Sequence, residues 1–283
     1  MINLPFEIDL KDKVAVVTGA GGVLCSLFAK AIARCGAKVA LLDLNLEAAA
    51  NFAADITAEG GTAKAYAANV LKKETLLEAR EQIRRDFGTC DILVNGAGGN
   101  NPRATTTNEY YLDGDMEKDI TTFFNLEPAG VEFVFNLNFL GTLIPTQVFA
   151  EDMLGKEDAC ILNVSSMNAF TPLTKIPAYS GAKAAVSNFT QWLAVHFSKA
   201  NIRVNAIAPG FFVTAQNQAL LFDEAGNPTA RTAKILNSTP MGRFGEAEEL
   251  IGSLLFLLSK PAAGFITGVV IPVDGGFSAY SGV

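Results

Sequence analysis

The residues of this sequence best suited to moving a proton are Tyr179 and Lys183, four positions apart in the stretch AYSGAK. Because the stretch has a helical pattern, both side chains should lie on one face of a helix. A nearby ammonium favours the ionised phenol and should lower its pKa from about 10. Tyr179 could then act as a general acid or base, and Ser166, at the end of an apolar run, could hydrogen-bond a substrate oxygen. The spacing is common by chance, however, and an ordinary surface pair is the alternative interpretation.

A glycine-rich stretch, TGAGGVLCS over residues 18–26, follows the apolar run VAVV and could bind a phosphate. Gly19 would permit a tight turn. Gly22 would let the backbone approach a pyrophosphate at the start of the next helix, where free N–H groups and the helix dipole favour anions. Cys25 stands where a third glycine would fall. Since that glycine only allows helix and strand to pack closely, a small cysteine should affect packing rather than phosphate binding. The alternative is a plain glycine turn.

An acidic residue at the end of the second apolar run, Asp43, strengthens the interpretation as a dinucleotide site. A carboxylate about 20 residues after such a loop accepts hydrogen bonds from the hydroxyls of the adenosine ribose. It would repel a 2′-phosphate, and no arginine or lysine follows it closely. The sequence therefore predicts NAD rather than NADP as the cofactor. Alternatively, Asp43 caps the helix that begins near Leu46.

The composition argues against several classes of protein. The chain has 283 residues, 49% of them hydrophobic, which allows a large core and disfavours disorder. A net charge of −7 disfavours nucleic-acid binding. No apolar run approaches the roughly 20 residues of a membrane span, and the acidic stretch MINLPFEIDLKDK is unlike a signal peptide. We therefore expect a soluble, cytoplasmic protein with no membrane partner.

The side chains that usually bind metals are few and scattered. The four cysteines have neither C-x-x-C nor any other metal spacing, which predicts reduced packing thiols. The single histidine, His196, excludes a multi-histidine metal site and argues against a Ser-His-Asp triad. We expect no metal ion, and we expect His196 to pack or to contact a partner subunit rather than to act in catalysis.

Apolar runs and helical patterns alternate along the chain, and this alternation predicts the fold. The expected strands are nearly all apolar, as a parallel sheet buried on both faces requires. We predict one α/β domain over residues 1–283, with a single Rossmann-type doubly wound parallel sheet of about seven strands and helices on both faces. Strands are expected near 13–18, 37–43, 63–67, 91–95, 159–164, 202–208 and 269–273, and helices near 23–35, 46–59, 72–87, 128–154, 177–199 and 246–258.

Two segments, near 99–127 and 210–245, break this rhythm. The first is polar and acidic, and the second contains FF, LLF and several glycines and prolines. Both follow strands and should lie at the carboxyl edge of the sheet, where open α/β sheets bind ligands. We expect both inserts to cover a substrate. Alternatively, they form an oligomer contact or a mobile surface loop.

Seven stretches of the chain together resemble the short-chain dehydrogenase/reductase superfamily. They are TGAGGVLC, NGAG, NLNFLGT, NVSS, YSGAK, NAIAPGFFVT and VVIPVDGGF, and they extend over nearly the whole chain. The resemblance implies a catalytic tetrad, which consists of Asn138, Ser166, Tyr179 and Lys183. Asn138 would hold a water that relays protons to Lys183, which would also bind the nicotinamide ribose. Ser166 would polarise the substrate carbonyl, and an oxidised nicotinamide would help Lys183 to lower the pKa of Tyr179.

The same resemblance implies where the cofactor and the partner subunits lie. Gly96 and its neighbours would pass under the adenosine ribose, and Asn69 stands where the family usually has an aspartate against the adenine. A homotetramer would form through the helices near 128–154 and 177–199 and the C-terminal segment. The predicted cofactor-binding residues are Gly19, Gly21, Gly22, Val23, Leu24, Asp43, Asn69, Val70, Asn95, Gly96, Ala97, Tyr179, Lys183, Pro209, Gly210, Phe212 and Thr214.

A narrower resemblance is to the D-mannonate oxidoreductases (fructuronate reductases) of this superfamily. It rests on GAGGNNPRATT, FVFNLNFLGTLIPTQVFAEDM, SSMNAFTPLTKIPAYSGAKAAVSNFTQWLAVHF and NAIAPGFFVTAQN. It implies reversible reduction of D-fructuronate to D-mannonate by NADH. Another sugar-acid or polyol dehydrogenase, such as a gluconate 5-dehydrogenase, is the alternative among enzymes. A catalytically idle NAD-binding regulator is the alternative in a different class, although all four tetrad residues are present.

A sugar-acid substrate needs a cation for its carboxylate and polar groups for its hydroxyls. Arg103 could supply a bidentate fork, and Lys175 lies in the loop before the tyrosine. Three short amides near the same edge, Asn100, Asn101 and Asn168, could bind hydroxyls. A solvated side chain is the alternative for each cation, and Asn100 and Asn101 could instead shape the turn that follows them.

Overall fold

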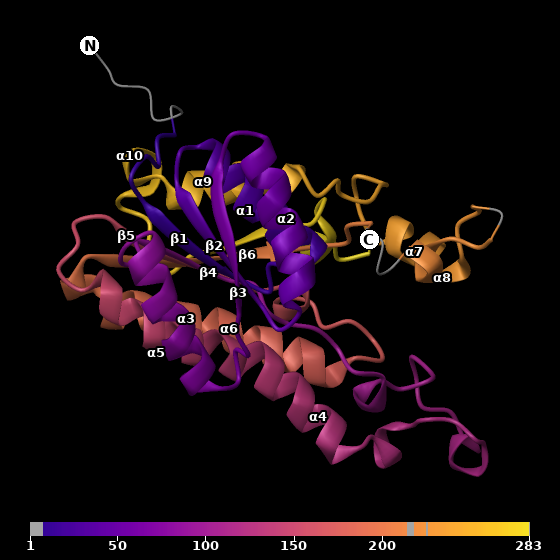
Figure 1. The fold of residues 1–283 in the computed structure, drawn as a ribbon. Helices are drawn as coiled ribbons and strands as arrows, with labels where there is room; N and C mark the ends of the chain where they lie inside the picture. The colour runs from indigo at the N-terminus through magenta and orange to yellow at the C-terminus, as the bar shows by residue number, and fades with distance from the viewer. Residues whose placement is uncertain (1–7, 214–217, 225, 283) are drawn as a thin grey trace.

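A seven-stranded sheet forms the centre of the protein in the computed structural model, which describes residues 8–213, 218–224 and 226–282 (Figure 1). The strands are β1 (Val14–Thr18), β2 (Lys38–Asp43), β3 (Thr62–Ala67), β4 (Ile92–Asn95), β5 (Ala159–Val164), β6 (Ile202–Pro209) and β7 (Val270–Val273). All neighbouring strands are parallel, in the order β3-β2-β1-β4-β5-β6-β7. The chain therefore winds outward twice from the centre, first to β3 and then to β7, which confirms the predicted doubly wound sheet.

Helices cover both faces of this sheet (Figure 1). The α-helices are α1 (Val23–Arg34), α2 (Leu46–Ala58), α3 (Lys73–Asp86), α4 (Pro128–Phe135), α5 (Gly141–Met153), α6 (Pro177–His196), α7 (Gln218–Leu221), α8 (Ala230–Asn237), α9 (Glu249–Leu258) and α10 (Lys260–Ala263). Short helical turns are η1 (Pro102–Ala104), η2 (Asp115–Glu117), η3 (Phe123–Asn125), η4 (Asn136–Leu140), η5 (Met167–Ala169), η6 (Ser198–Ala200) and η7 (Phe277–Ala279). One apolar core lies between the sheet and α1, α2 and α9, around Phe28 and Leu254, and the other lies between the sheet and α3, α5 and α6, around Phe149 and Met153.

Burial along the strands follows their place in the sheet. β1, in the centre, is buried at every position, as a strand between two helical layers must be. β3 departs from the expected apolar run, because its residues TAKAYA include exposed positions and bury only Tyr66. β3 is an edge strand and packs less of its surface against the helices, so it tolerates polar side chains.

The segment predicted as one helix over 128–154 is two helices, α4 and α5, joined by the π-helical turn η4. By length and mean hydropathy, Pro128–Met153 is the one helix of the described residues that could cross a membrane, although polar residues such as Glu132, Asn136 and Asn138 interrupt its apolar run. Half of its most apolar window is buried inside the protein, which is typical of a core helix. The π turn buries the polar side chain of Asn138, and such turns are frequent at functional sites.

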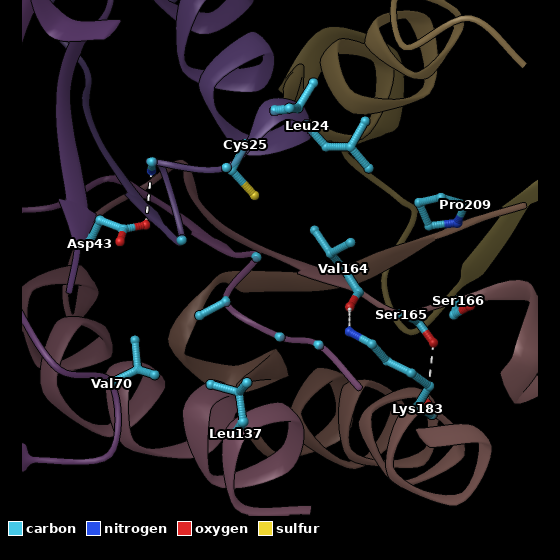
Figure 2. Close-up of a pocket in the computed structure, with 18 of the residues that line it drawn as sticks. Leu24, Cys25, Asp43, Val70, Leu137, Val164, Ser165, Ser166, Lys183 and Pro209 are labelled. Carbon is cyan, nitrogen blue, oxygen red and sulfur yellow. Dashed lines mark hydrogen bonds between the residues drawn. The ribbon is translucent and has the colours of Figure 1, made fainter. Parts of the chain in front are cut away.

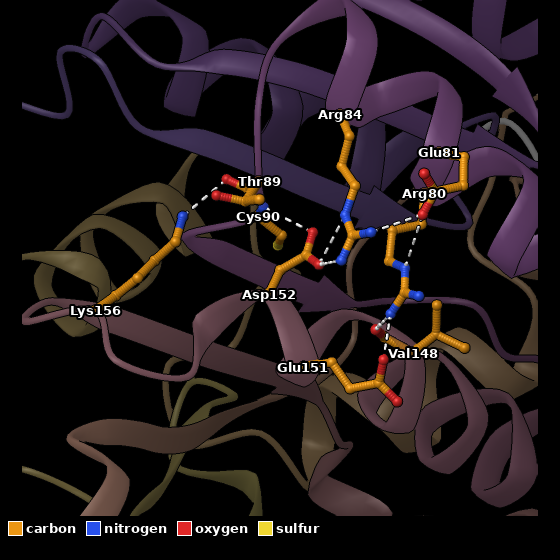
Figure 3. A network of polar contacts seen from close by, with 9 residues as sticks. All are labelled: Arg80, Glu81, Arg84, Thr89, Cys90, Val148, Glu151, Asp152 and Lys156. Atoms are coloured by element: carbon orange, nitrogen blue, oxygen red, sulfur yellow. Dashed lines mark hydrogen bonds and ion pairs between the residues drawn. The ribbon is translucent and has the colours of Figure 1, made fainter.

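A charged network fastens α5 to α3 (Figure 3). The side chain of Asp152 on α5 is 1% exposed, and it accepts hydrogen bonds from Arg84 of α3 at 3.1 and 2.5 Å. It also accepts from the backbone N–H of Cys90 at 3.1 Å. Arg80, one turn earlier on α3, donates to Glu151 at 2.6 Å. The network therefore fixes α5, and with it the π turn that precedes α5.

Asp152→Asn should lower the free energy of unfolding by about 2 kcal/mol, because it removes the buried anion that Arg84 requires. The measurement is urea denaturation at pH 7, compared with the wild type. Glu59→Gln is the control, since Glu59 is exposed and pairs with Lys30 across α1 and α2; its loss should stay below about 1 kcal/mol. Equal losses in the two variants would contradict the structural role of Asp152.

Candidate active site

A cleft of about 630 Å³ lies at the carboxyl ends of the central strands (Figure 2). Its volume is in the range of small-molecule and cofactor sites. Its walls come from the loops after β1 and β4, the ends of β2 and β5, the start of α6 and the stretch after β6. Of the predicted cofactor-binding residues that the structure describes, all but Asn95 line this cleft.

The glycine loop turns tightly beside the cleft. Gly19 has a φ of +68°, and a Cβ built on it would lie 2.9 Å from the backbone of Ala97, so a larger residue does not fit. A Cβ on Gly21 would lie 2.9 Å from the carboxyl carbon of Asp43. Gly22 is the N-cap residue of α1, and no side chain of the described residues caps the first turn of this helix. The backbone N–H groups there are suited to an anion such as a pyrophosphate.

Asp43 faces the glycine loop from the end of β2 (Figure 2). Its Oδ2 accepts a hydrogen bond from the N–H of Gly21 at 2.9 Å, and its Oδ1 accepts one from the N–H of Asn45 at 2.8 Å. The alternative role as the cap of α2 is wrong, because Asn45 caps that helix through its own side chain. A carboxylate has further lone pairs, so Asp43 can still accept hydrogen bonds from a ligand in the cleft.

Cys25, in the place of a third glycine, packs against the loop after β4. A Cβ on Gly96 would lie 2.1 Å from the sulfur of Cys25, so the two segments meet this closely only because residue 96 is glycine. Burial raises the pKa of the Cys25 thiol to about 12, which keeps the thiol protonated and unreactive at neutral pH. This geometry agrees with an effect on packing.

Tyr179 and Lys183 lie one turn apart near the start of α6. The Nζ of Lys183 is 5.7 Å from the centre of the Tyr179 ring, and it donates a hydrogen bond of 2.8 Å to the carbonyl of Val164 (Figure 2). Lys183 is only 4% exposed, so the surface-pair alternative is wrong. Burial lowers the pKa of Lys183 to about 8, because the ammonium loses its hydration.

The pKa of Tyr179 lies above its ordinary value, because burial disfavours the phenolate. A hydrogen bond with Ser166 acts in the opposite direction and is the smaller effect. The sequence predicts that Lys183 lowers the pKa of Tyr179, whereas the environment in the protein raises this pKa. This environment holds the phenol in its protonated form, and a protonated phenol at neutral pH is the form that can donate a proton to a carbonyl oxygen.

The other two members of the tetrad differ in their position. Ser166 follows β5 and lines the cleft, and its hydroxyl accepts a hydrogen bond from the N–H of Asn168 at 3.3 Å. Asn138 is buried in the π turn and donates to the carbonyls of Gly99 and Val134, both at 2.8 Å. It also accepts from the N–H of Gly99 at 3.2 Å. Its side chain thus fixes the loop after β4 where this loop borders the cleft.

Among the predicted cofactor residues, Asn69 lines the cleft, Asn95 does not, and Thr214 lies outside the described residues. Asn95 is 1% exposed, and its amide donates to Thr146 and to Asn163, each at 2.9 Å. These contacts join β4 to α5 and β5. The structure therefore gives Asn95 a role in the core under the cleft, in contrast to the predicted cofactor contact.

Three of the predicted substrate residues, Asn100, Asn101 and Arg103, lie in the first insert and interact with residues of this insert or with Glu127. Asn101 accepts a hydrogen bond from the N–H of Arg103 at 2.9 Å and so caps η1, as the turn-shaping alternative predicts. Asn100 donates to Thr105 at 3.0 Å. Arg103 is half exposed, and its guanidinium lies 3.4 Å from the carboxylate of Glu127. None of the three lines the cleft.

Asn168 and Lys175, the other two substrate candidates, have unusual environments near the tetrad. Asn168 is 4% exposed, and its Oδ1 has no hydrogen-bond partner among the described residues; such a buried acceptor needs a partner. Lys175 has a φ of +72°, a left-handed conformation that few residues other than glycine adopt. Its carbonyl accepts a hydrogen bond from the N–H of Thr106, in the first insert, at 2.9 Å.

The cleft has further lining residues that were not among the predicted site residues. They are Cys25, Leu44, Ala68, Gly98, Gly99, Leu137, Val164, Ser165 and Phe211. A Cβ on Gly98 would lie 2.6 Å from the Oδ1 of Asn138 and 3.2 Å from the Nζ of Lys183, so this glycine makes room for both. The glycine pair in GAGG is the one signal that could have pointed to it. The partner of Lys183 at Val164 is a backbone oxygen, which no residue type reveals.

The family model described as short chain dehydrogenase matches residues 13–225 of this sequence. The chain belongs to the short-chain dehydrogenase family. It is therefore an oxidoreductase that acts on a CH–OH group. Ser166, Tyr179 and Lys183 all line the cleft.

Several relatives match the chain over nearly its whole length. An uncharacterized oxidoreductase of Haemophilus influenzae is 64% identical over 282 residues, which cover 100% of this chain and 99% of the relative. Gluconate 5-dehydrogenase of Gluconobacter oxydans is 32% identical, with coverage of 97% and 98%. A solved structure of a candidate D-mannonate oxidoreductase from Haemophilus influenza, with NAD bound, is 64% identical, with a TM-score of 0.95 over 99% of this chain and 100% of that one.

Proposed function

We propose that this protein is an NAD-dependent oxidoreductase that interconverts D-mannonate and D-fructuronate. One observation supports this above the others: the solved relative that is 64% identical over nearly all of both chains holds NAD and is a candidate D-mannonate oxidoreductase. A gluconate 5-dehydrogenase activity is the second candidate, because an enzyme of that name is 32% identical. The complete tetrad argues against an idle NAD-binding regulator.

The cleft is suited to NAD through several groups of this chain. The glycine loop and the start of α1 would hold the pyrophosphate, and Asp43 would bind the hydroxyls of the adenosine ribose. The negative charge of Asp43 would disfavour the 2′-phosphate of NADP. Lys183 would bind the nicotinamide ribose. When bound, the cofactor supplies or accepts the hydride.

The proton of the reaction belongs to Tyr179. In the direction of reduction, its phenol donates the proton to the substrate oxygen, and the hydroxyl of Ser166 stabilises the negative charge that develops on this oxygen. The ammonium of Lys183, 5.7 Å from the Tyr179 ring centre, stabilises the phenolate that remains. In the direction of oxidation, the same phenolate takes the proton from the substrate hydroxyl. Asn138 acts on this chemistry by holding Gly99 at the border of the cleft.

The substrate would lie at the tyrosine end of the cleft, under the two inserts of a single domain. Asn168 would accept a hydrogen bond from a substrate hydroxyl, because its buried Oδ1 has no partner among the described residues. Lys175 would face the carboxylate. Arg103 is the second candidate for that role, and its guanidinium lies 3.4 Å from the carboxylate of Glu127.

The test is steady-state NADH oxidation with D-fructuronate, D-tagaturonate and 5-ketogluconate under identical conditions. The proposal expects kcat/KM for D-fructuronate at least about tenfold above the other two, which corresponds to about 1.4 kcal/mol of transition-state preference. A higher value for 5-ketogluconate would favour the gluconate 5-dehydrogenase alternative. NADH binding without turnover of any of the three would favour the idle regulator.

Asp43→Ala should lower kcat/KM for NADH by about 30-fold, because the variant loses charge-assisted hydrogen bonds to the ribose of about 2 kcal/mol. NADPH should lose nothing or gain, since the repulsion of its 2′-phosphate disappears. Both values come from initial rates at varied cofactor concentration. Asp55→Ala, an exposed position of α2, removes the same charge away from the cleft and should change neither value. A loss of equal size with both cofactors would contradict the selective role of Asp43.

We also propose a cytoplasmic homotetramer. An apolar groove of about 550 Å³ runs between α5 and α6, with Leu143 and Phe189 in its walls, and the indole of Trp192 beside them is 55% exposed. His196 stacks on Trp192 with ring centres 4.6 Å apart, away from the cleft. Exposed apolar side chains that gather in one groove are typical of a contact with another protein chain. Light scattering after size exclusion tests the proposal, and a monomer at micromolar concentration would contradict it.

A further inference from the structure

Glu109 of the first insert lies near three cations where the two inserts meet. Lys234 of α8 lies 2.9 Å from both carboxylate oxygens of Glu109, which belongs to the first insert and is 125 positions away in the sequence. Arg231 precedes Lys234 by one turn of α8, so the two side chains share a face. Arg231 and Lys175 also act electrostatically on Glu109. We name Lys175, Arg231 and Lys234 the cation cluster.

The three residues of the cation cluster lie outside the lining of the cleft, on segments that lead to it or follow from it. Lys175 stands one turn before Tyr179, in the loop that leads into α6. The first insert packs on this loop, since the N–H of Thr106 donates to the carbonyl of Lys175 at 2.9 Å. The insert follows β4 and α8 follows β6, so both extend from the carboxyl edge of the sheet, and Figure 1 shows them on the same side of it. Sites at this edge are where ligands of such sheets bind.

The conformation of Lys175 is a second sign of function in this loop. Its φ of +72° is left-handed and costs about 1 kcal/mol or more in a residue with a Cβ. Strain of this kind persists where the surrounding structure enforces it, and it is concentrated at ligand sites. Here the contact with the first insert and the start of α6 enforce it and set the direction of the chain at Lys175.

Glu109 does not neutralise the three positive charges of the cation cluster. Three cations and one carboxylate leave a net charge of +2 in a chain whose total is −7. The chain as a whole gives no long-range attraction for an acid, so attraction of an anion has to be local. Glu109 shows that Lys234 can pair with a carboxylate, and this hydrogen bond, with smaller effects of Lys175 and Arg231, holds the pKa of Glu109 below its ordinary value. The surplus charge remains for a second carboxylate.

We propose that Lys175, Arg231 and Lys234 recognise the carboxylate of an acidic substrate, and that Glu109 is the internal counter-ion with which this carboxylate competes. The inference rests on the proposed sugar-acid function and assigns the specificity for an acid to residues outside the tetrad. Lys234 and Arg231 are both exposed, and an exposed ion pair contributes at most about 1 kcal/mol to stability. Variants of these residues should therefore fold.

Lys234→Met and Arg231→Met test the cluster by comparing acids with a neutral ketose. Initial rates of NADH oxidation would be measured with D-fructuronate, 5-ketogluconate and D-fructose. We expect each variant to lower kcat/KM for the acids about tenfold, mainly through KM, and to leave D-fructose within about twofold. Added NaCl should weaken the wild-type rate with the acids and affect the variants less, because salt screens exposed charges. Lys30→Met, from an exposed ion pair between α1 and α2, is the matched control and should change none of these values.

Glu109→Gln should have the opposite effect on KM to that of the Lys234 and Arg231 variants. It removes the internal competitor for the cations, so KM for the acids should fall about threefold while KM for D-fructose stays constant. Equal losses for acids and D-fructose in the Lys234 and Arg231 variants, or no loss for the acids, would overturn the inference. A wild-type protein that reduces D-fructose as efficiently as both acids would instead overturn the proposed function.

Discussion

Tyr179→Phe should lower kcat for carbonyl reduction about 1,000-fold and leave the dissociation constant of NADH within about threefold. The substitution keeps the ring and its packing and removes only the hydroxyl that we propose as the proton donor, and general acid catalysis is worth about 10²- to 10⁴-fold. NADH should still bind, because the glycine loop, Asp43 and Lys183 are unchanged. Steady-state rates at pH 7 give kcat, and a fluorescence titration gives the affinity for NADH.

A second tyrosine of the chain provides the control for this experiment. Tyr66 on the edge strand β3 also has a buried ring, and its hydroxyl lies 2.8 Å from Asp86, far from the tetrad in the sheet. Tyr66→Phe should therefore leave kcat within about twofold, whatever it does to stability. If Tyr179→Phe retained more than about a tenth of the wild-type kcat, another group would have to donate the proton.

The framework of the site could be predicted from the sequence because it depends on local patterns. An apolar run such as Val14–Val17 can only be a buried strand when a glycine loop and an amphipathic helix follow it. Asp43 ends the next strand, and parallel strands bring their carboxyl ends to one edge of the sheet. Spacing alone thus places Asp43 beside the glycine loop, where it accepts a hydrogen bond from Gly21.

Features that depend on how deeply a side chain is buried could not be predicted from the sequence. The distance between Tyr179 and Lys183 along a helix indicates that they share a face, but it says nothing about how much water reaches them. Burial decides the direction of the pKa of Tyr179, and it outweighs the hydrogen bond with Ser166. Asn95 likewise belongs to a motif at the cleft, yet its side chain turns into the core. The π turn at Asn138 also has no period of its own that a sequence pattern could reveal.

Lys183→Met should make the protein less active and, at pH 7, more stable. The variant loses the cation that stabilises the phenolate and binds the nicotinamide ribose, so kcat/KM should fall at least about 100-fold. Stability should change in the opposite direction, because the ammonium is 4% exposed and its pKa falls from 10.5 to about 8 on folding. That difference corresponds to a penalty of about 3 kcal/mol for the charged form in the folded state. Methionine fills a similar volume without charge and loses only the hydrogen bond to Val164, worth about 1 kcal/mol.

The dependence on pH separates this explanation from a general improvement in packing. Between pH 8 and 10.5 the folded protein binds fewer protons at Lys183 than the unfolded chain does, so the stability of the wild type rises with pH across that window. Below pH 8 the full penalty remains. We therefore expect the variant to be more stable than the wild type by about 2 kcal/mol at pH 7 and by little or nothing at pH 10. Urea denaturation of both proteins without cofactor, at the two pH values, measures the difference. A gain of the same size at both would show that packing rather than charge is responsible, and a loss at pH 7 would show that the bond to Val164 outweighs the cost of burying the ammonium.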